Sequence, residues 1–370
     1  MHPRVDIVRT PNPIGSTATT GSHAASPLAR TLLSLEMPMR LTTFTLTALS
    51  ALSSLATACL GTTGDSRKPG SAGSGSDSQT TDGRPCSQVA TDVMIRSAAD
   101  MAALPRTGCY DIYGKLTVQG QAITSLADLN EINSVNELDL DHTALTTIDT
   151  KRPLGIYGKL TLTGNAKLTD LKPLSFETAS TGILIDGNTA LISLDPLGLA
   201  DPMLAEVDGD IAITGNTALT AIPLGNLTTL TGALTVSNNP ALTSLALGQL
   251  AGAGHIEISD NVKLASLGAM SALYRVTGSV TIDGNAALTD LAAFTTSLKF
   301  IDQTLTISNN AALTGLGALK HVSLIGEISI TGNTSLLTCR ATEVDKCTQH
   351  PIASVISNNK TASCTSSCAD

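Results

Sequence analysis

The sequence is poor in aromatic residues and has no tryptophan. Aromatics make up 2% of the 370 residues, although hydrophobic residues make up 42%. Leu, Ile, Val and Ala therefore carry the hydrophobic share, which favours thin aliphatic layers over one bulky globular core. Basic patches are also missing, and the formal net charge is -9. This charge argues against nucleic acid as a partner.

Catalytic and metal-binding motifs are absent as well. The 6 His residues are scattered, and neither an H-E-x-x-H nor a G-x-S-x-G sequence occurs. No Gly-rich phosphate loop follows an expected strand. The sequence therefore predicts no catalytic residue, no metal site and no cofactor, and the protein is expected not to be an enzyme.

What the sequence does contain is a phrase that returns every 22 to 28 residues. Two apolar residues flank a polar one, and a polar residue and a turn pair ending in Asn follow, from Leu160-Thr-Leu162-Thr-Gly164-Asn165 to Ile328-Ser-Ile330-Thr-Gly332-Asn333. The alternation predicts short strands with one face inward. A fixed period of this length indicates a solenoid.

The residue before each repeated Asn is always Gly, Asn or Asp, the types that tolerate a left-handed backbone, so this position is expected to have positive φ. The Asn is expected to be buried and to hydrogen-bond the turns of neighbouring coils. The predicted ladder is Asn165, Asn188, Asn216, Asn239, Asn261, Asn285, Asn310 and Asn333. Two earlier coils lack the Asn, and one of them places His142 at the left-handed position, where we interpret it as a turn residue rather than a metal ligand.

Other features mark a second corner and the two ends of the array. Gly residues two positions before several strands, such as Gly232 and Gly278, predict a second recurring corner. Residues 97–104, from Ser97 to Leu104, carry a helix-start signal and predict a short N-terminal capping helix. The segment from Ile356 to Asn359 predicts a last coil.

The front of the chain predicts export and lipid attachment. Residues 1–36 are interpreted as a disordered leader or a mis-called start, and residues 37–58 as a signal peptide. The ending Leu-Ala-Thr-Ala-Cys59 resembles a bacterial lipobox, which makes Cys59 the predicted lipidation site. Residues 59–85 are rich in Gly and Ser and predict a flexible tether, and residues 86–370 hold the solenoid.

The sequence has 7 cysteines, which leaves six once Cys59 is assigned to a lipid. These six lie at the two ends of the array, where disulfides would secure the terminal coils. They are Cys86, Cys109, Cys339, Cys347, Cys364 and Cys368. We favour pairs Cys86–Cys109 and Cys339–Cys364, although the connectivity is open on sequence grounds.

Outward residues of equivalent strands are expected to form rows about 4.8 Å apart. Strand propensity and the solubility of a solvated sheet face explain the hydroxyl-rich strip that results, and the strip is also a candidate binding face, with residues Asp139, Asp141, Thr161, Thr163, Asp186, Thr235, Glu257, Thr281 and Asp283. Two alternatives use the same strip. A polysaccharide hydrolase would use the Asp139, Asp141 and Asp186 carboxylates, and an ice-binding solenoid would use the Thr rows, which Leu184, Ala212 and Glu257 interrupt.

The repeated Gly-x-Leu-x-Ile-x-Gly-Asn phrase and the Cys86 to Cys109 entry resemble the receptor L-domain, a relative of leucine-rich repeats found in insulin- and EGF-type receptors. The resemblance covers about Cys86 to Cys368 and is closer still to bacterial L-domain-like lipoproteins. It implies an all-β, right-handed parallel β-solenoid, here of about 10 to 11 coils, and binding to other proteins. The receptors' furin-like module, transmembrane helix and kinase are missing, so hormone binding is not carried over.

Together these features predict an exported, lipid-anchored, non-enzymatic binding or surface-architecture module. Its partner is expected to be a protein or a cell-envelope polymer, and its only membrane contact the N-terminal lipid. The predicted location is the bacterial cell envelope, as an outer-membrane lipoprotein of either face. Sequons at Asn226, Asn333 and Asn359 suggest a eukaryotic cell-wall protein as the rival origin, and the bacterial origin is favoured.

Overall fold

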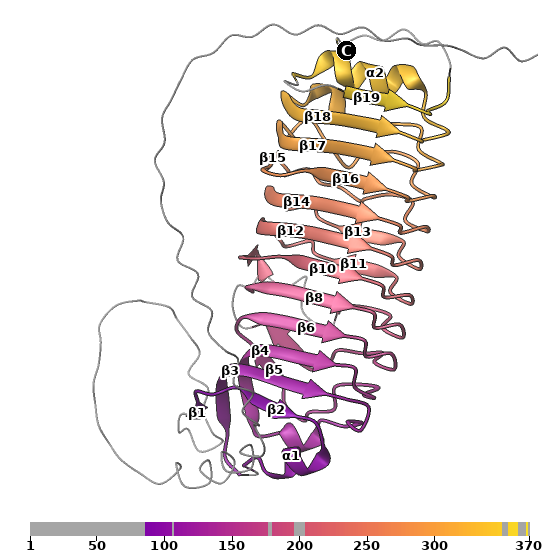
Figure 1. Cartoon of the computed structure of the whole chain (residues 1–370). Coiled ribbons are helices and arrows are strands. Elements are labelled where there is room, and N and C mark those ends of the chain that lie inside the picture. Colours follow the sequence, from indigo (N-terminus) through magenta and orange to yellow (C-terminus); the bar gives the residue numbers. More distant parts are fainter. Residues whose placement is uncertain are drawn as a thin grey trace, which may run out of the picture. The chain divides into compact units, whose positions relative to one another are not determined.

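The computed structural model describes residues 86–105, 107–176, 180–195, 204–349, 354–361 and 368, all within one compact unit, Arg67–Asp370. Parallel strands stack into a β-solenoid of about 11 turns, as the repeat period predicts (Figure 1). The expected leader, signal peptide, lipidated Cys59 and tether lie outside the described residues.

One sheet of 17 strands runs the length of the stack, and its strands lie parallel in register. The strands of the main face are β2 (Val93–Ile95), β3 (Tyr110–Gln119), β4 (Ile132–Asp141), β6 (Lys159–Thr163), β8 (Gly182–Asp186), β10 (Ile211–Thr214), β12 (Thr229–Ser237), β14 (Gly252–Ser259), β16 (Val280–Asp283), β17 (Phe300–Ser308), β18 (Leu324–Thr331) and β19 (Ser354–Ser357).

Short strands form an adjoining side face; all but one of them pair with the first half of a long strand, and β7 (Leu174–Phe176) pairs with the short strand β5 (Leu154–Ile156). They are β1 (Ser87–Val89), β5 (Leu154–Ile156), β7 (Leu174–Phe176), β9 (Glu206–Val207) and β15 (Arg275–Val276). A separate two-stranded sheet consists of β11 (Ala221–Pro223) and β13 (Ser244–Ala246). Each coil thus contributes strand segments to more than one side of the solenoid.

The core is a stack of aliphatic layers. In the coil that starts with β12, Leu234, Val236, Leu242, Leu247 and Leu250 are all 0% exposed. Their spacing follows from the strand alternation and from the inward Leu residues of the loops. Burial of each such side chain stabilises the fold by about 2 kcal/mol.

The corner that follows the main-face strands has the predicted left-handed residue in every coil. The φ values range from 55° to 70° at the eight positions before the repeated Asn, namely Gly164, Gly187, Gly215, Asn238, Asp260, Gly284, Asn309 and Gly332. His142 also has φ 49°, and Asn358 of the last coil has φ 56°. The turn chemistry read from the sequence is confirmed at these positions.

The second corner is a bend within long strands rather than a break between two strands. The long strands β3, β12, β14, β17 and β18 continue through it, and a register shift between Leu230 and Ala233 accommodates the bend in β12. Glycine is needed here because the backbones approach closely. A Cβ atom on Gly254 would lie 2.5 Å from the Thr231 carbonyl oxygen.

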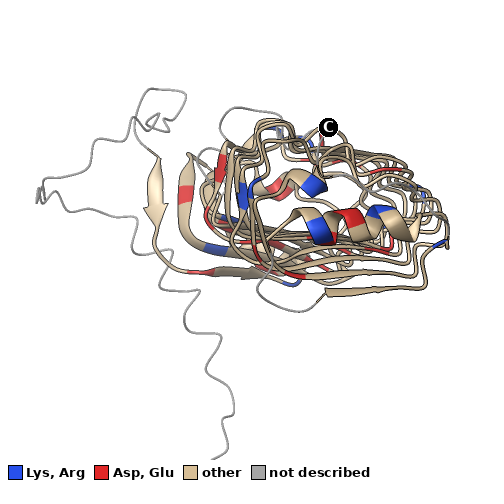
Figure 2. Cartoon of the chain, turned by 90° about the horizontal axis from the view of Figure 1, so that it is seen from above, with Lys and Arg blue, Asp and Glu red and all other residues tan. Residues whose placement is uncertain are grey.

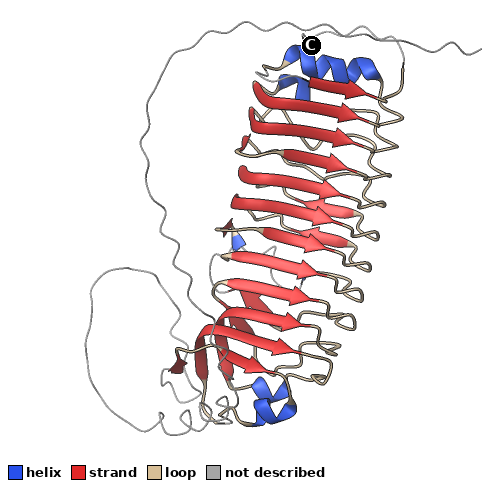
Figure 3. Cartoon of the chain, in the orientation of Figure 1, coloured by secondary structure: helices blue, strands red, loops and turns tan. Residues whose placement is uncertain are grey.

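Helices lie at both ends of the stack (Figure 3). The predicted N-terminal helix is α1 (Ala98–Ala102), in which the Ser97 hydroxyl accepts a hydrogen bond from the Asp100 backbone N–H. The helix α2 (Thr338–Cys347) at the other end was not predicted. Viewed along the stack, α2 crosses the outline of the coils (Figure 2). It buries Ala341, Val344 and Glu343, too few apolar residues to give a helical pattern.

Disulfides secure both ends, as the cysteine positions predict. The favoured pair Cys86–Cys109 is present, with Cα atoms 4.9 Å apart. At the other end Cys347 pairs with Cys368. Cys339 is also disulfide-bonded, and its favoured partner Cys364 lies outside the described residues.

Candidate functional site

The main face carries the two rows of outward residues that we predicted as a candidate binding face, hereafter the strip. The first row is Thr117, Asp139, Thr161, Leu184, Ala212, Thr235, Glu257, Thr281, Thr306 and Ser329, all in parallel register. The second row is Gln119, Asp141, Thr163, Asp186, Thr214, Ser237, Ser259, Asp283, Ser308 and Thr331. The strip is therefore continuous along the stack.

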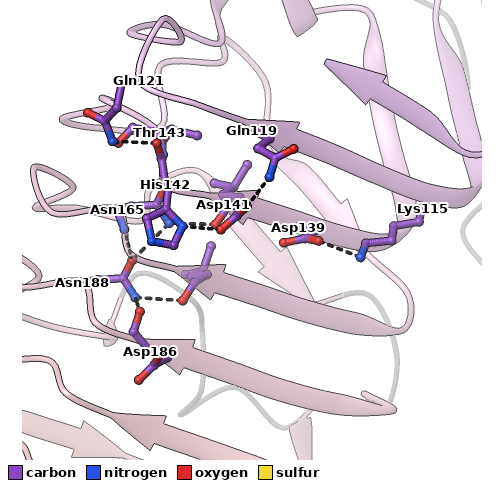
Figure 4. Close-up of polar contacts among 12 residues, drawn as sticks. Lys115, Gln119, Gln121, Asp139, Asp141, His142, Thr143, Asn165, Asp186 and Asn188 are labelled. Atoms are coloured by element: carbon purple, nitrogen blue, oxygen red, sulfur yellow. Dashed lines mark hydrogen bonds and ion pairs between the residues drawn. The ribbon is translucent and has the colours of Figure 1, made fainter. Parts of the chain in front are cut away.

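The acidic end of the strip is held by hydrogen bonds and ion pairs (Figure 4). The Lys115 ammonium lies 2.6 Å from Asp139 Oδ2, and this contact raises the pKa of Lys115. Asp141 accepts a hydrogen bond from the Gln119 amide at 2.6 Å, and its other oxygen lies 2.5 Å from His142 Nδ1. Each carboxylate thus has a partner in its own coil or in the preceding one.

These contacts favour the ionised form of Asp141. The hydrogen bond with His142, and secondly that from Gln119, lower the pKa of Asp141 below its usual value near 3.8, against an opposing effect of burial. A glycosidase acid needs the reverse, a carboxyl whose pKa is raised so that it is protonated near neutral pH. Asp141 is therefore suited to electrostatics and hydrogen bonding rather than to proton donation.

Further along the second row, the carboxylates accept hydrogen bonds from the next coil. Asp186 accepts from the Thr214 hydroxyl. Asp283 accepts from the Ser308 hydroxyl at 2.5 Å and from the Asn309 amide at 2.9 Å. These side chains are pre-organised, because neighbours fix them before any ligand arrives.

The carboxylates of the hydrolase alternative lie at the spacing that the repeat register predicts. Thr163 lies in register between Asp141 and Asp186, so the two carboxylates are two coils apart. That separation is about 9.6 Å at the usual strand spacing. Within the described ranges, no group of three His, Cys, Asp or Glu residues could hold a metal ion.

The Asn residues of the repeat are internal and form the predicted ladder. In the middle of the stack, the Asn239 amide donates to the Ile213 carbonyl at 2.9 Å, and its Oδ1 accepts from the Asn216 backbone N–H at 3.0 Å. The same pattern runs from Asn165 to Asn333 and ends at Asn359. All eight predicted ladder residues are 0% exposed, so their role is structural.

Thr143 ends the Asn ladder on one side and Asn359 ends it on the other. Thr143 takes the place of Asn in the coil before Asn165, and both its backbone N–H and its hydroxyl donate to Asn165 Oδ1. Two of the three sequons coincide with the ladder, since Asn333 and Asn359 are buried and their amides donate to backbone carbonyls. Neither side chain is accessible for glycosylation in the folded protein.

One surface cluster was missed by sequence reasoning. The rings of Tyr274 and Phe300 meet edge to face with centroids 5.5 Å apart, and the Arg275 guanidinium lies 5.5 Å from the Phe300 centroid. Arg275 also donates two hydrogen bonds to Asp302 Oδ2, at 2.6 and 3.0 Å. The signal was present in the repeat register, which pairs Arg275 with Phe300, but not in any local motif.

A cavity of about 280 Å³ lies beside α2, lined by residues that include Lys320, Arg340 and Glu343. Glu343 is buried and forms ion pairs with Arg340 at 3.1 Å and with Lys320 at 3.5 Å. The Lys320–Glu343 pair attaches the helix to the last coils, and the Arg340–Glu343 pair lies within the helix, so the polar lining of the cavity has a structural explanation.

Comparison with known proteins adds no assignment. Neither the protein-family models nor the curated proteins include a match to this chain. Among the helices in the described part of the chain, none is long and apolar enough to cross a membrane.

Proposed function

We propose that the protein is an exported, lipid-anchored, non-enzymatic module that binds a protein or a cell-envelope polymer through the strip. The observation that carries the proposal is the strip itself, two mostly polar rows in unbroken register over ten coils of a sheet face, in which Leu184 and Ala212 are the apolar members. Its Asp carboxylates are held by their neighbours, so binding through them would require little further ordering.

The proposed location in the bacterial envelope is based on the lipobox-like sequence at Cys59, the Gly/Ser-rich tether and the disulfides. Disulfides persist in oxidising compartments such as the periplasm and the cell surface. A lipid on Cys59 followed by a tether would hold the solenoid away from the outer membrane, with its sides accessible. The membrane contact proposed is the lipid alone.

The binding proposal is tested with variants that obstruct the strip. Thr235→Arg and Thr281→Arg place long cations in the middle of the first row, at half-buried outward positions. Ala265→Arg is the matched control, because Ala265 is exposed outside the strip. The full chain is immobilised and exposed to envelope extract with cross-linking. We expect one defined partner to be retained by wild type and Ala265→Arg and lost with both strip variants; equal retention by all four proteins would contradict the proposal.

The hydrolase alternative has its own test. Purified full chain is incubated with envelope polysaccharide, and released reducing ends are measured for wild type and Asp141→Asn. The proposal expects no release by either protein. Release that Asp141→Asn abolishes would establish the enzyme in place of the binding module.

Lipid attachment is measured by intact mass and by metabolic labelling with a fatty-acid analogue. We expect a lipid on wild type, none on Cys59→Ala, and three disulfides in both. An unlabelled wild-type chain released into the medium would rule out the anchor.

A further inference from the structure

The loop that follows the Asn ladder contains the same turn in four coils. In each of them a side-chain oxygen accepts a hydrogen bond from the backbone N–H two residues further along, at 2.8 to 3.2 Å. The acceptor and donor residues are Asp170 and Lys172, Ser193 and Asp195, Ser266 and Gly268, and Asp290 and Ala292. A parallel bridge places Gly315 of the next coil opposite Asp290. That coil therefore has no side-chain oxygen at the position that closes the turn.

The N–H group of Gly317, two residues after Gly315, is left without an acceptor. Its backbone matches that of Gly268, since φ is 57° at Gly317 and 68° at Gly268, and a Cβ atom on either would clash with a Leu carbonyl oxygen of the preceding coil. The Gly268 N–H donates to the Ser266 hydroxyl at 3.2 Å. By the same geometry the Gly317 N–H points to the place that a side chain at position 315 would take, and it donates to no atom in the described part of the chain.

The place of the missing side chain belongs to the cavity beside α2. This cavity has a volume of about 280 Å³, and Gly315, Gly317 and Arg340 are among the residues that line it. It is larger than a cavity of about 150 Å³, which holds one benzene molecule, so a small organic molecule fits. Leu316 and Val344 also line the cavity and are buried, so they provide an apolar surface for such a molecule.

The charges on the cavity lining favour an anion. Its charged residues are two cations, Lys320 and Arg340, and one carboxylate, Glu343. The ion pairs of Glu343 explain why these charges are present, but they use only Nη1 of Arg340, at 3.1 Å. Nε and Nη2 of Arg340 donate to no group within the described ranges, and the side chain is 53% exposed. Asp290 opposes an anion, because a Cβ atom at position 315 would lie 3.4 Å from its own Cβ.

We infer that the cavity binds a small monocarboxylate, whose carboxylate accepts hydrogen bonds from the Gly317 N–H and the Arg340 guanidinium and whose apolar part lies on Leu316 and Val344. A guanidinium can hold a carboxylate through two parallel N–H donors. The ligand thereby fills the role that the Asp290 carboxylate has in its own coil. The inference does not depend on the strip, because the cavity is formed by α2 and the loop after β17 rather than by the main-face strands.

The test titrates the full chain with benzoate and with benzamide, which keeps the ring and lacks the charge. The chain is labelled with ¹⁵N-glycine, and the amide signal of Gly317 is assigned by labelling of Leu–Gly pairs and by its shift in Gly315→Ser. We expect a saturable shift of this signal with benzoate, with a dissociation constant of about 1 mM, and at least about tenfold weaker binding of benzamide.

One variant removes the charged donor. Arg340→Gln lacks the guanidinium, and its matched control Lys346→Gln removes a cation of the same helix that is not part of the cavity lining. Because a hydrogen bond to a charged group is lost, we expect benzoate to bind at least about tenfold more weakly to Arg340→Gln. Calorimetry should give the same affinity for Lys346→Gln as for wild type.

A second variant supplies the missing acceptor without a change of charge. Gly315→Ser offers its hydroxyl to the Gly317 N–H, as Ser266 does in its own coil. The control Gly225→Ser adds the same side chain where a Cβ atom meets nothing within 4 Å. We expect benzoate binding to weaken at least about fivefold in Gly315→Ser and to stay unchanged in the control.

A third variant should improve binding, which damage to the fold cannot do. Asp290→Asn removes the opposing charge and keeps an acceptor for the Ala292 N–H. We expect benzoate to bind about two- to threefold more tightly to this variant. Equal or weaker binding by Asp290→Asn with an unchanged circular dichroism spectrum counts against the site.

The inference is overturned if benzoate up to about 20 mM, well above the expected dissociation constant, gives no saturable shift of the Gly317 signal. Binding that survives Arg340→Gln or Gly315→Ser undiminished also overturns it. Benzamide that binds as tightly as benzoate, or sulfate that displaces benzoate at equal concentration, shows a site that does not select a carboxylate and has the same consequence. Each of these results leaves the partner of the strip unaffected.

Discussion

Replacing one ladder residue, Asn239, by Ala tests the interaction that holds successive coils in register. The Asn239 amide donates to the carbonyls of Ile213 and Ser237, and its oxygen accepts from the backbone N–H of Asn216. Asn239→Ala leaves the Ile213 carbonyl and the Asn216 N–H buried without these partners. Each orphaned group costs about 1–3 kcal/mol, so we expect a loss of about 4 kcal/mol in the free energy of unfolding.

The measurement is equilibrium urea unfolding followed by circular dichroism, with the disulfides intact. The control is Asn238→Gly, at the adjacent exposed position with φ 55°, where glycine fits the left-handed backbone without strain. We expect this control to lie within about 0.5 kcal/mol of wild type. A loss below about 1 kcal/mol for Asn239→Ala, or one equal to that of the control, would refute the ladder as a stabilising element.

A second substitution at the same position separates hydrogen bonding from size. Asn239→Asp keeps an acceptor for the Asn216 N–H but loses the donor and places a carboxylate against the Ile213 carbonyl oxygen. Burial then raises the pKa of the introduced carboxyl above its unfolded value. The destabilisation is complete above the folded-state pKa and declines as pH falls through it, because the protonated acid can donate. Equal destabilisation at pH 7 and pH 4 would contradict this reasoning.

Three further outcomes follow from local geometry. The hydrogen bond with His142 lowers the pKa of Asp141 in the folded protein. Its contribution to the free energy of unfolding is therefore complete above the unfolded-state pKa near 3.8 and is lost as pH falls through the folded-state pKa. Asp141→Asn should reduce the loss of stability at acid pH. Gly254→Ala should destabilise by about 1–3 kcal/mol in urea unfolding, and Gly225→Ala by less than about 0.5 kcal/mol. Reduction of the N-terminal disulfide should cost about 3 kcal/mol and accelerate amide exchange in the first coil only.

The sequence determined the repeat, the corners and the ladder because each depends on residue types within one short phrase. Only Gly, Asn and Asp precede the repeated Asn, and that restriction identifies the left-handed corner without any structure. The outward rows followed from strand alternation and stacking alone. His142 was placed correctly by the same rule.

Features that depend on contacts between coils could not be read in this way. Tyr274 and Phe300 meet through a register of 25 residues, and a shift of one residue would place either ring elsewhere. The role of Thr143 as a substitute ladder residue required its hydroxyl geometry. Helix α2 lacks apolar periodicity, because an ion pair of its buried Glu343 with Lys320 of the preceding coil holds it and the disulfide Cys347–Cys368 joins it to the chain after it.

The two ends of the solenoid explain why its sides are the expected binding surfaces. A parallel stack exposes an unpaired strand edge at each end, and such edges promote aggregation. Here the terminal main-face strands β2 and β19 have only 3 and 4 residues, and α1 and α2 pack against them. Growth by end-to-end stacking of copies is thereby opposed. The strip lies on a side of the solenoid, between the capped ends, so a partner can reach it without access to either end of the stack.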